Sequence, residues 1–359
     1  MKSIKVLVAD DSALMRQTLK RLISAEPGME IVGLARDGED AVAKARDLRP
    51  DVVTMDINMP KLDGVTALQL ILEDKICPVV MVSSLTQRGA MTTFECLELG
   101  AFDFVAKPDG TVSSNLGTVA GELVSKIRAA AAAGVLERVS SFRARRLASR
   151  ERVSPPPVAR WQTTKAVAVA IGISTGGPAT LSEVLPFLPA DLPASVFLVQ
   201  HMPPSFLTAF ARRLNDNCPL NVVEARAGMP VQAGFCYVAP GALQLCPYRK
   251  TNGDIVIRTP AQPKTLFMPS VNVMMQAVLE TYGPNTVGVL MTGIGDDGAD
   301  QMVRIRAAGG FTIAESEETA VVYGMPREAF ERGGADVVAP HYDIAQQIVQ
   351  AIGKVGAKQ

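Results

Sequence analysis

Short apolar runs alternate with longer amphipathic segments along most of the chain, and this alternation limits the folds available to it. The first half has five such runs, at residues 4–9, 30–33, 51–55, 78–82 and 102–106. The second half has seven more, at residues 166–173, 194–200, 220–223, 234–238, 286–291, 310–314 and 335–338. Strands that alternate with helices pair in parallel and are covered by helices on both faces. We therefore expect two doubly wound α/β domains, the first five-stranded and the second mostly parallel.

A segment of different composition separates the two halves. Between about residues 130 and 162, arginines accumulate and Ser154 is followed by three prolines. Such sequence cannot bury a core and is typical of a linker. We place a first domain at residues 1–125, a linker at 126–164 and a second domain at 165–353. The arginines could dock on an acidic surface, although a solvated spacer is the simpler interpretation.

Composition argues against several protein classes. The 36 basic and 36 acidic side chains give a formal net charge of zero, which offers no electrostatic case for binding nucleic acid. The five cysteines form no CxxC pair, so neither a disulfide framework nor a zinc site is indicated, as is usual in a reducing cytoplasm. The chain starts with a strand-like segment, not a signal peptide, and has no uncharged stretch that suits a membrane span. We expect a cytoplasmic protein without membrane insertion.

Polar side chains follow four of the five strands expected in the first domain. Asp10 and Asp11 follow the first strand, Asp56 the third, Ser83 the fourth and Lys107 the fifth. These strand ends share one edge of a parallel sheet, so the side chains should converge. Crowded carboxylates suit a hard cation such as Mg²⁺, and beside a metal and a lysine one of them can accept a phosphoryl group. Taken singly, an Asp-Asp pair is usually a turn or a helix cap, but the combination predicts a phosphorylation site.

The same residues resemble the receiver domain of bacterial response regulators. The matching segments are residues 8–12, 55–60, 82–84 and 106–108, and the resemblance covers roughly residues 1–125. It implies a flavodoxin-like fold in which Asp56 is the phosphoacceptor and Ser83 and Lys107 support the phosphoryl group. The implied ligands of Mg²⁺ are Asp10, Asp11, Asp56 and Asn58. Phe104 falls at the family's switch aromatic, and a plain core position is an equally good interpretation of it.

Three segments of the second domain also follow expected strands. Ser174 lies within residues 170–178, His201 within 199–204 and Asp297 within 291–298. A hydroxyl becomes a nucleophile when a base takes its proton, and the base works best when a carboxylate holds its tautomer. Geometry defines such a triad, whatever the order of its members along the chain. We therefore predict a Ser-His-Asp triad, with backbone N–H groups near Thr175 and Gly176 as candidate oxyanion donors.

Each member of the predicted triad has a simpler interpretation. The glycine-rich loop around Ser174 could hold a phosphate on its N–H groups, although it lacks the lysine of a P-loop. A strand-end histidine such as His201 is more often structural. One of Asp296 and Asp297 is expected to cap a helix, and a metal bound by the pair is a weaker alternative. His341 is expected in a surface turn without a catalytic role.

The second domain is similar to the catalytic domain of the chemotaxis protein-glutamate methylesterase family, CheB. The match runs from about residue 166 to 350 and rests on residues 171–178, 200–204, 238–241, 269–272, 292–298 and 321–326. The resemblance implies that Ser174 is the nucleophile, His201 the general base and acid, and Asp297 the orienting carboxylate, without a cofactor at the esterase site. The chain departs from the family at Asn272, Gln244, Ile294 and residues 315–318. At these places the family commonly has, in the same order, aspartate, histidine, methionine and a segment that begins Gln-Asp-Glu.

A receiver followed by this catalytic domain is the family's own architecture, so the resemblance also implies a function. It implies a phosphorylation-activated serine hydrolase that demethylates glutamate 5-O-methyl esters on methyl-accepting chemoreceptors and can deamidate glutamines. A chemotaxis histidine kinase would be the phosphodonor, and we expect a monomer. We further hypothesise that the unphosphorylated receiver limits access to Ser174. Two competing functions are a phosphorylation-dependent binding module, in which Ser174 is structural, and a DNA-binding regulator, whose output domain would be small, basic and helical.

Overall fold

The computed structural model describes residues 3–84, 87–107, 116–132, 136 and 166–357. The chain divides into two compact units, residues 1–151 and 152–359. Their boundary falls inside the segment expected to be a linker, most of which lies outside the described residues.

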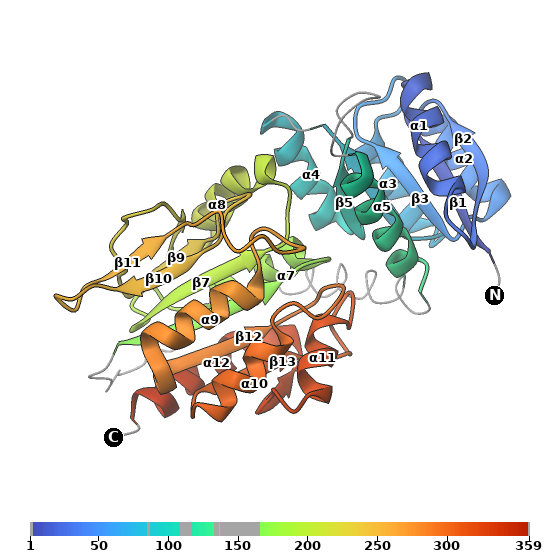
Figure 1. Ribbon diagram of the computed structural model, residues 1–359. Coiled ribbons are helices and arrows are strands. Elements are labelled where there is room, and N and C mark those ends of the chain that lie inside the picture. The colour runs from blue at the N-terminus through green and yellow to red at the C-terminus, as the bar shows by residue number, and fades with distance from the viewer. Residues whose placement is uncertain (1–2, 85–86, 108–115, 133–135, 137–165, 358–359) are drawn as a thin grey trace. The chain divides into compact units, whose positions relative to one another are not determined.

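The first unit contains a five-stranded parallel sheet of order β2-β1-β3-β4-β5 with helices on both faces (Figure 1). The strands are β1 (Ile4–Ala9), β2 (Met29–Ala35), β3 (Val52–Asp56), β4 (Val79–Ser83) and β5 (Asp103–Ala106). The helices are α1 (Ala13–Ser24), α2 (Gly38–Leu48), α3 (Gly64–Glu73), α4 (Gln87–Leu99) and α5 (Leu116–Ala130). The predicted doubly wound, five-stranded fold is confirmed. Helix α5 continues to Ala130, five residues past the domain boundary expected from the sequence.

Short polar residues fix where three of these helices begin. The side chains of Ser12, Asp37 and Asp63 accept hydrogen bonds from backbone N–H groups in the first turns of α1, α2 and α3. Such caps satisfy N–H groups that have no partner within the helix. Strands β3 and β4 are buried along their whole length, as expected of parallel strands covered on both faces.

The second unit is built on a seven-stranded parallel sheet of order β14-β13-β12-β6-β7-β9-β8. The strands are β6 (Val167–Ile173), β7 (Ala194–Gln200), β8 (Asn221–Glu224), β9 (Phe235–Val238), β12 (Thr286–Leu290), β13 (Phe311–Glu315) and β14 (Val337–Ala339). The helices are α7 (Gly177–Val184), α8 (Pro204–Asn217), α9 (Val271–Tyr282), α10 (Ala299–Ala307), α11 (Met325–Glu331) and α12 (His341–Gly356). Two short 3₁₀ helices, η1 (Leu185–Phe187) and η2 (Gly283–Asn285), complete it. All seven expected runs form strands.

An antiparallel hairpin outside the main sheet was not predicted. Its strands are β10 (Cys246–Arg249) and β11 (Ile255–Arg258). Pro247 interrupts the first strand, which therefore lacks a continuous apolar run, and the apolar run of the second, Ile255–Ile257, is only three residues long. The hairpin nevertheless packs on the unit because Ile257 is buried in the same core cluster as residues of α9.

The order of the strands determines where a site can form in each unit. In the second unit the chain passes from β6 to β7 on one side and later from β12 to β14 on the other. In the first unit the order of the strands reverses in the same way at β1, which lies between β2 and β3. Ligands of open α/β sheets bind at the carboxyl ends of strands where the order reverses in this way. A site is therefore expected at the carboxyl ends of β6 and β1.

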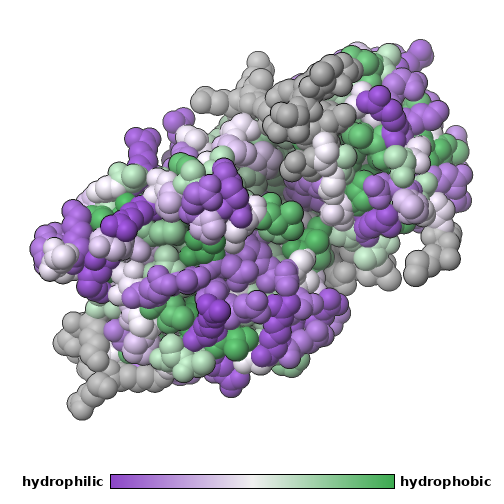
Figure 2. Space-filling view, in the orientation of Figure 1, coloured by the Kyte–Doolittle hydropathy of each residue, from purple (hydrophilic) through white to green (hydrophobic). Residues whose placement is uncertain are grey.

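Two observations concern the surface and the helices. Figure 2 shows hydrophilic and hydrophobic residues intermixed on the visible face of the second unit. Within the described part of the chain, no helix combines the length and the apolar character needed to cross a membrane.

Candidate functional site

The first unit brings three carboxylates and a lysine together at the ends of β1, β3 and β5. Ligand oxygens of Asp10, Asp11 and Asp56 lie within 4.8 Å of one another. Lys107 Nζ lies 2.9 Å from Asp10 Oδ2 and 2.9 Å from Asp56 Oδ2. Asp10 and Asp56 are buried, whereas Asp11 is exposed. The convergence expected from parallel strand ends is therefore present in the structure.

Burial and charge have opposite effects on the pKa of Asp56 and on that of Lys107. Burial raises the pKa of the Asp56 carboxyl above its ordinary value, and the hydrogen bond and charge of Lys107 only partly oppose it. For Lys107, burial lowers the pKa, but its hydrogen bonds with Asp10 and Asp56 outweigh burial and leave the pKa raised. The lysine therefore remains a cation beside two buried carboxyl groups, an arrangement that suits a transferred anionic group.

The remaining residues predicted for this site have different surroundings. The Ser83 hydroxyl accepts a hydrogen bond from Thr93 Oγ1 at 2.7 Å and lies at the end of β4. Asn58 is exposed, two residues beyond Asp56. Phe104 lies in β5 and is buried, with Lys126 Nζ 5.2 Å from its ring centroid. Burial fits both a core residue and a switch residue, so the role of Phe104 stays open.

In the second unit, Ser174 lies in a tight turn directly after β6. Its N–H donates to Thr292 O at 2.9 Å, and its carbonyl accepts hydrogen bonds from Gly177 N and Gln200 Nε2. Gly176 has a φ of +79°, which strongly favours glycine, and a side chain there would meet Val321. The turn therefore fixes the backbone of Ser174 on both sides. Among the described residues, the Ser174 hydroxyl has no hydrogen-bond partner.

His201 follows the neighbouring strand β7 and is held by Asp297 from the far side of β6. The His201 N–H donates to Ile173 O at 3.1 Å, which places the histidine beside the turn of Ser174. Its ring Nε2 lies 2.9 Å from Asp297 Oδ2. Its Nδ1 is buried and makes no hydrogen bond within the described part of the chain. An ionised Asp297 accepts a hydrogen bond from Nε2–H, so the ring proton stays on Nε2 and the lone pair of the ring is on Nδ1.

Asp297 is anchored by the amino-terminal end of α9. Its Oδ1 accepts hydrogen bonds from Ser270 Oγ and Asn272 N, both at 2.9 Å, and its Oδ2 accepts one from Val271 N at 2.7 Å. Burial acts to raise the pKa of Asp297, but the hydrogen bond and charge of His201, together with these N–H groups, outweigh it and lower the pKa. Asp297 is therefore an ionised and fixed acceptor for His201.

The N–H groups of Thr175 and Gly176 are available to an oxyanion. Neither donates a hydrogen bond to an acceptor in the described residues. Gly176 caps α7, whose amino-terminal end carries partial positive charge. Both groups lie within two residues of Ser174, so a negative oxygen bound to the serine would find donors nearby.

Two sequence-based expectations were wrong. Asp296 does not cap a helix with its side chain, because α10 has Gly298 as its N-cap, and Asp296 instead binds Arg332 at 2.7 Å. His341 does not lie in a surface turn: it is the buried first residue of α12, and its N–H donates to Thr319 Oγ1 at 2.9 Å. No metal-ligating cluster includes Asp296 or Asp297 among the described residues.

Sequence reasoning assigned no role to three residues that support the triad. Ser270 donates to Asp297, and the ring of Phe267 stacks on that of His201 with centroids 4.2 Å apart. Gln244 is fully buried, and its Oε1 accepts a hydrogen bond from Ser270 N at 2.9 Å. The only available signal was the Ser-Val-Asn segment at 270–272, a typical helix start whose N–H groups attract a carboxylate.

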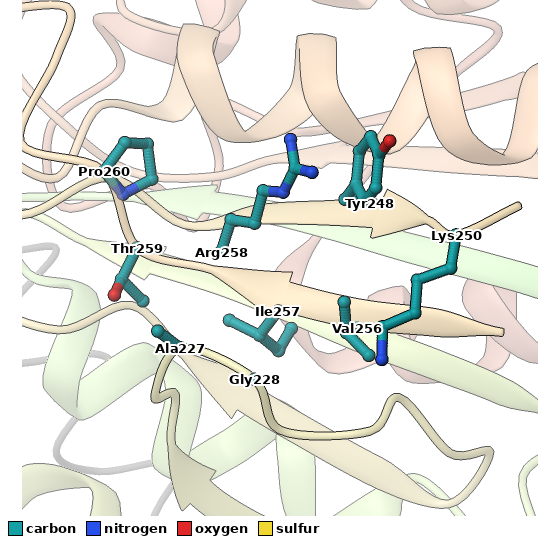
Figure 3. A pocket seen from close by; sticks show the side chains of 9 residues that line it. All are labelled: Ala227, Gly228, Tyr248, Lys250, Val256, Ile257, Arg258, Thr259 and Pro260. Atoms are coloured by element: carbon teal, nitrogen blue, oxygen red, sulfur yellow. The ribbon is translucent and has the colours of Figure 1, made fainter.

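A hollow of about 460 Å³ lies on the β10–β11 hairpin and is open to solvent (Figure 3). Its lining includes Gly228, Lys250, Ile257 and Arg258, and no member of the triad. The Arg258 guanidinium carbon lies 3.2 Å from the ring centroid of Tyr248. The lining of this hollow thus shares no residue with the arrangement of Ser174, His201 and Asp297.

Comparison with known proteins places both units. A family model described as CheB methylesterase matches residues 169–348, and one described as response regulator receiver domain matches residues 6–112. Protein-glutamate methylesterase/protein-glutamine glutaminase 3 of Syntrophomonas wolfei subsp. wolfei is 56% identical over 355 residues, which cover 98% of this chain and 100% of the relative. The protein of the same name, without the number, from Caldanaerobacter subterraneus subsp. tengcongensis is 50% identical over 358 residues, 98% of each chain.

A solved structure supports the assignment of the second unit. The CheB methylesterase catalytic domain of Thermotoga maritima superposes with a TM-score of 0.51 at 38% sequence identity. The match covers 52% of this chain and 99% of that domain. Its fold is thus shared by the unit that contains Ser174, His201 and Asp297.

Proposed function

The chain belongs to the CheB methylesterase family whose members carry an amino-terminal receiver domain, and on that premise we propose that Ser174, His201 and Asp297 perform its hydrolysis. It is a protein-glutamate methylesterase and protein-glutamine glutaminase under the control of a receiver. One observation carries the proposal: the 2.9 Å pair of His201 Nε2 and Asp297 Oδ2 lies beside Ser174 at the switch point of the sheet. A binding module in which Ser174 is only structural would not require the pair of His201 and Asp297.

The reaction begins when Nδ1 of His201 takes the hydroxyl proton of Ser174. The serine oxygen attacks the ester carbonyl of a methylated glutamate side chain, and the carbon–methoxy bond breaks as Nδ1–H gives its proton to the methoxy oxygen, which leaves as methanol. Nδ1 then takes a proton from water, whose oxygen attacks the acyl carbon. The bond from that carbon to the serine oxygen breaks, the serine oxygen recovers the proton from Nδ1, and glutamate leaves. Hydrogen bonds between catalytic groups often tighten only when substrate is bound, so the unpartnered hydroxyl of Ser174 fits this role. With a glutamine substrate, ammonia leaves in place of methanol.

Negative charge forms on the carbonyl oxygen during both steps. We assign its stabilisation to the N–H groups of Thr175 and Gly176, which have no other acceptor among the described residues. Loss of one such donor typically costs about 10²–10³ in rate. Asp297 holds the imidazolium that forms beside this charge, and its own anchoring by α9 keeps the ring of His201 in place.

Phosphorylation takes place in the first unit, with Asp56 as the proposed acceptor. An Asp56 oxygen attacks the phosphorus of a donor, and the donor's own bond to that phosphorus breaks. Lys107, 2.9 Å from Asp56 Oδ2, offsets the charge that arrives, and Ser83 supplies a hydroxyl at the neighbouring strand end. The oxygens of Asp10, Asp11 and Asp56 fit Mg²⁺, with Asn58 as a further proposed ligand. When bound, Mg²⁺ neutralises charge on the transferred phosphoryl group.

Partners, location and control follow from this function. We propose a chemotaxis histidine kinase as phosphodonor, methyl-accepting chemoreceptors as substrates, and a monomer in the cytoplasm as the acting form. The proposed domains are residues 1–125 and 165–353, joined by the linker at 126–164. In the resting protein the first domain limits access to Ser174, and phosphorylation of Asp56 relieves this limit.

Labelling of the serine tests the triad directly. A fluorophosphonate probe reacts only with an activated hydroxyl, so the native protein should be labelled at Ser174. Ser182→Ala is the matched control, because the hydroxyl of Ser182 merely donates to Pro178 O within α7. Labelling that is abolished by Ser174→Ala and His201→Gln but unaffected by Ser182→Ala supports the proposal. Equal labelling of the Ser174→Ala protein would refute it.

A further inference from the structure

The hydrolysis described above makes no use of a second carboxyl group buried near Ser174. Glu315 ends strand β13, and its side chain is completely buried. Its Oε2 accepts a hydrogen bond from Thr292 N at 2.8 Å, and its Oε1 accepts one from Thr319 Oγ1 at 2.9 Å. No cation pairs with it in the described part of the chain. Buried carboxyl groups without a cation are uncommon, because burial disfavours the charged form.

Thr292 connects this carboxyl group to the nucleophile. The carbonyl of Thr292 accepts the N–H of Ser174 at 2.9 Å, and its hydroxyl donates to Thr175 O at 2.9 Å. Val322 N in turn donates to the same hydroxyl at 2.9 Å. Every polar group of Thr292 is thus committed, and its N–H is the one that Glu315 holds. The position of Ser174 depends on Thr292, and the position of Thr292 depends on Glu315.

Among the described residues, no charged side chain offsets the charge of an ionised Glu315. Burial raises its pKa from 4.5 to about 7, while the donors Thr292 and Thr319 act in the opposite direction. His341 is the nearest titratable neighbour by hydrogen bonding, since its N–H donates to Thr319 Oγ1. The charged residues of the following segment and of the adjoining α10, α11, β14 and α12 regions are exposed or half-buried: Glu317, Glu318, Asp300, Arg304, Arg306, Arg327, Glu331, Arg332, Asp336 and Lys354 are exposed, and Glu328 and Asp343 are half-buried. The carboxyl group therefore gains or loses its proton without a compensating ion.

We propose that Glu315 is a positioning residue for the hydrolysis, and that the presence or absence of its proton tunes the reactivity of Ser174 through Thr292. The inference rests on the proposed function, because it requires that Ser174 be the nucleophile. In the neutral form one oxygen accepts from Thr292 while the other can donate to Thr319, much as a glutamine would. In the ionised form both oxygens accept hydrogen bonds. A negative charge then lies one residue, Thr292, away from the turn that carries Ser174.

The order of the strands gives the direction of the effect. Along the sheet the sequence is β13, β12, β6 and β7, so Glu315 lies closer to the turn after β6 than to His201 after β7. An ionised Glu315 therefore opposes the oxyanion forming at Ser174 more than it favours the imidazolium of His201. The neutral form should be the faster enzyme, and Glu315→Gln should fix that form.

The test is the rate of fluorophosphonate labelling of the full chain between pH 5.5 and 9. The ratio of the Glu315→Gln rate to the native rate should be close to one below pH 6 and reach about fivefold above pH 8. Its midpoint should fall near pH 7. Glu317→Gln makes the same change at an exposed neighbour and should follow the native profile. A ratio that does not vary with pH overturns the inference.

A second pair of variants keeps the test independent of the fold. Thr319→Val removes a donor to the Glu315 carboxylate and should move the midpoint to higher pH, whereas Thr319→Ser keeps the hydroxyl and should leave it unchanged. Identical midpoints for these two variants would also contradict the inference. The outcome for the proposed function is separate: labelling that persists in Ser174→Ala refutes that function, whereas loss of labelling with a flat Glu315→Gln ratio refutes only the role of Glu315.

Discussion

His201 Nε2 lies 2.9 Å from Asp297 Oδ2, and the opposite ring nitrogen, Nδ1, is buried without a hydrogen bond in the described residues. The carboxylate thus selects which nitrogen carries the proton in the resting enzyme. Three donors from the start of α9 hold that carboxylate in turn. The nitrogen that we propose as the base is consequently determined by a helix start that is distant from both residues in the sequence.

Asp297→Asn should nearly abolish hydrolysis. Each carboxylate oxygen already accepts from two donors, so an amide NH₂ at either place meets N–H or O–H groups and cannot hold Nε2–H of His201. In a serine protease the corresponding change of tautomer costs about 10⁴ in kcat, and we expect a loss of about that size. Methanol release from methylated receptor gives kcat directly. The adjacent Asp296→Asn should retain nearly full activity, and equal losses in both variants would argue against the assigned role of Asp297.

Gly293→Ala should impair both activity and stability. A Cβ at this position would lie 2.3 Å from Met325 Sδ and 2.7 Å from Ser174 Cβ, so the turn of the nucleophile would have to shift. Overpacking of this kind usually costs about 1–3 kcal/mol. Gly353→Ala in α12 is the control, since a Cβ there meets nothing within 4 Å. Thermal unfolding and labelling of Ser174 should both report the difference, and a fully active Gly293→Ala protein would contradict the geometry.

The stability of the second unit should depend on pH because Glu315 ionises. Its pKa is raised on folding, so its contribution to stability is present below pH 4.5 and is lost as pH rises through about 7. The gap between these two values corresponds to roughly 3 kcal/mol. At pH 8, Glu315→Gln should therefore stabilise the second unit by up to about 3 kcal/mol, with little change at pH 5. Calorimetry at the two pH values measures this, and equal shifts at both would show that the carboxyl group does not titrate near 7.

Asp297 should act in the opposite direction. Its pKa is lowered on folding, so the stability it contributes is present above its ordinary value of 3.8 and is lost as pH falls through the folded value. Native protein should thus lose stability below pH 4 more steeply than Asp297→Asn. Parallel acid-unfolding curves for the two proteins would be inconsistent with an ionised Asp297.

Removal of Mg²⁺ should separate the two units functionally. A chelator should prevent phosphorylation of Asp56 by a small-molecule donor, because the oxygens of Asp10, Asp11 and Asp56 would be left without the cation that suits them. Basal hydrolysis at Ser174 should be unaffected. Asp56→Asn should likewise keep the basal rate and lose activation. Activation by phosphodonor that persists in Asp56→Asn would contradict the choice of acceptor.

Much of the fold and of the site could be predicted because parallel strands carry local signals. Apolar runs mark the strands, and the polar residue after each run marks the edge where groups converge, as for Asp56 and Ser174. The support of Asp297 could not be predicted, because Ser270 comes from a helix start that only tertiary packing brings near. His341 was misjudged for a similar reason: its neighbours Pro340 and Asp343 suggest a turn, whereas its burial depends on Thr319. The β10–β11 hairpin has only the short apolar run at residues 255–257 and is held by contacts with α9.

Methanol release from methyl-labelled receptor membranes tests the central claim most directly. The intact protein and Ser174→Ala would each be assayed with and without a small-molecule phosphodonor and Mg²⁺. We predict release by the intact protein that rises with phosphodonor, and none by Ser174→Ala under either condition. Release by Ser174→Ala at the native rate, or no release by the intact protein even with phosphodonor, would contradict a receiver-controlled hydrolase that acts through Ser174.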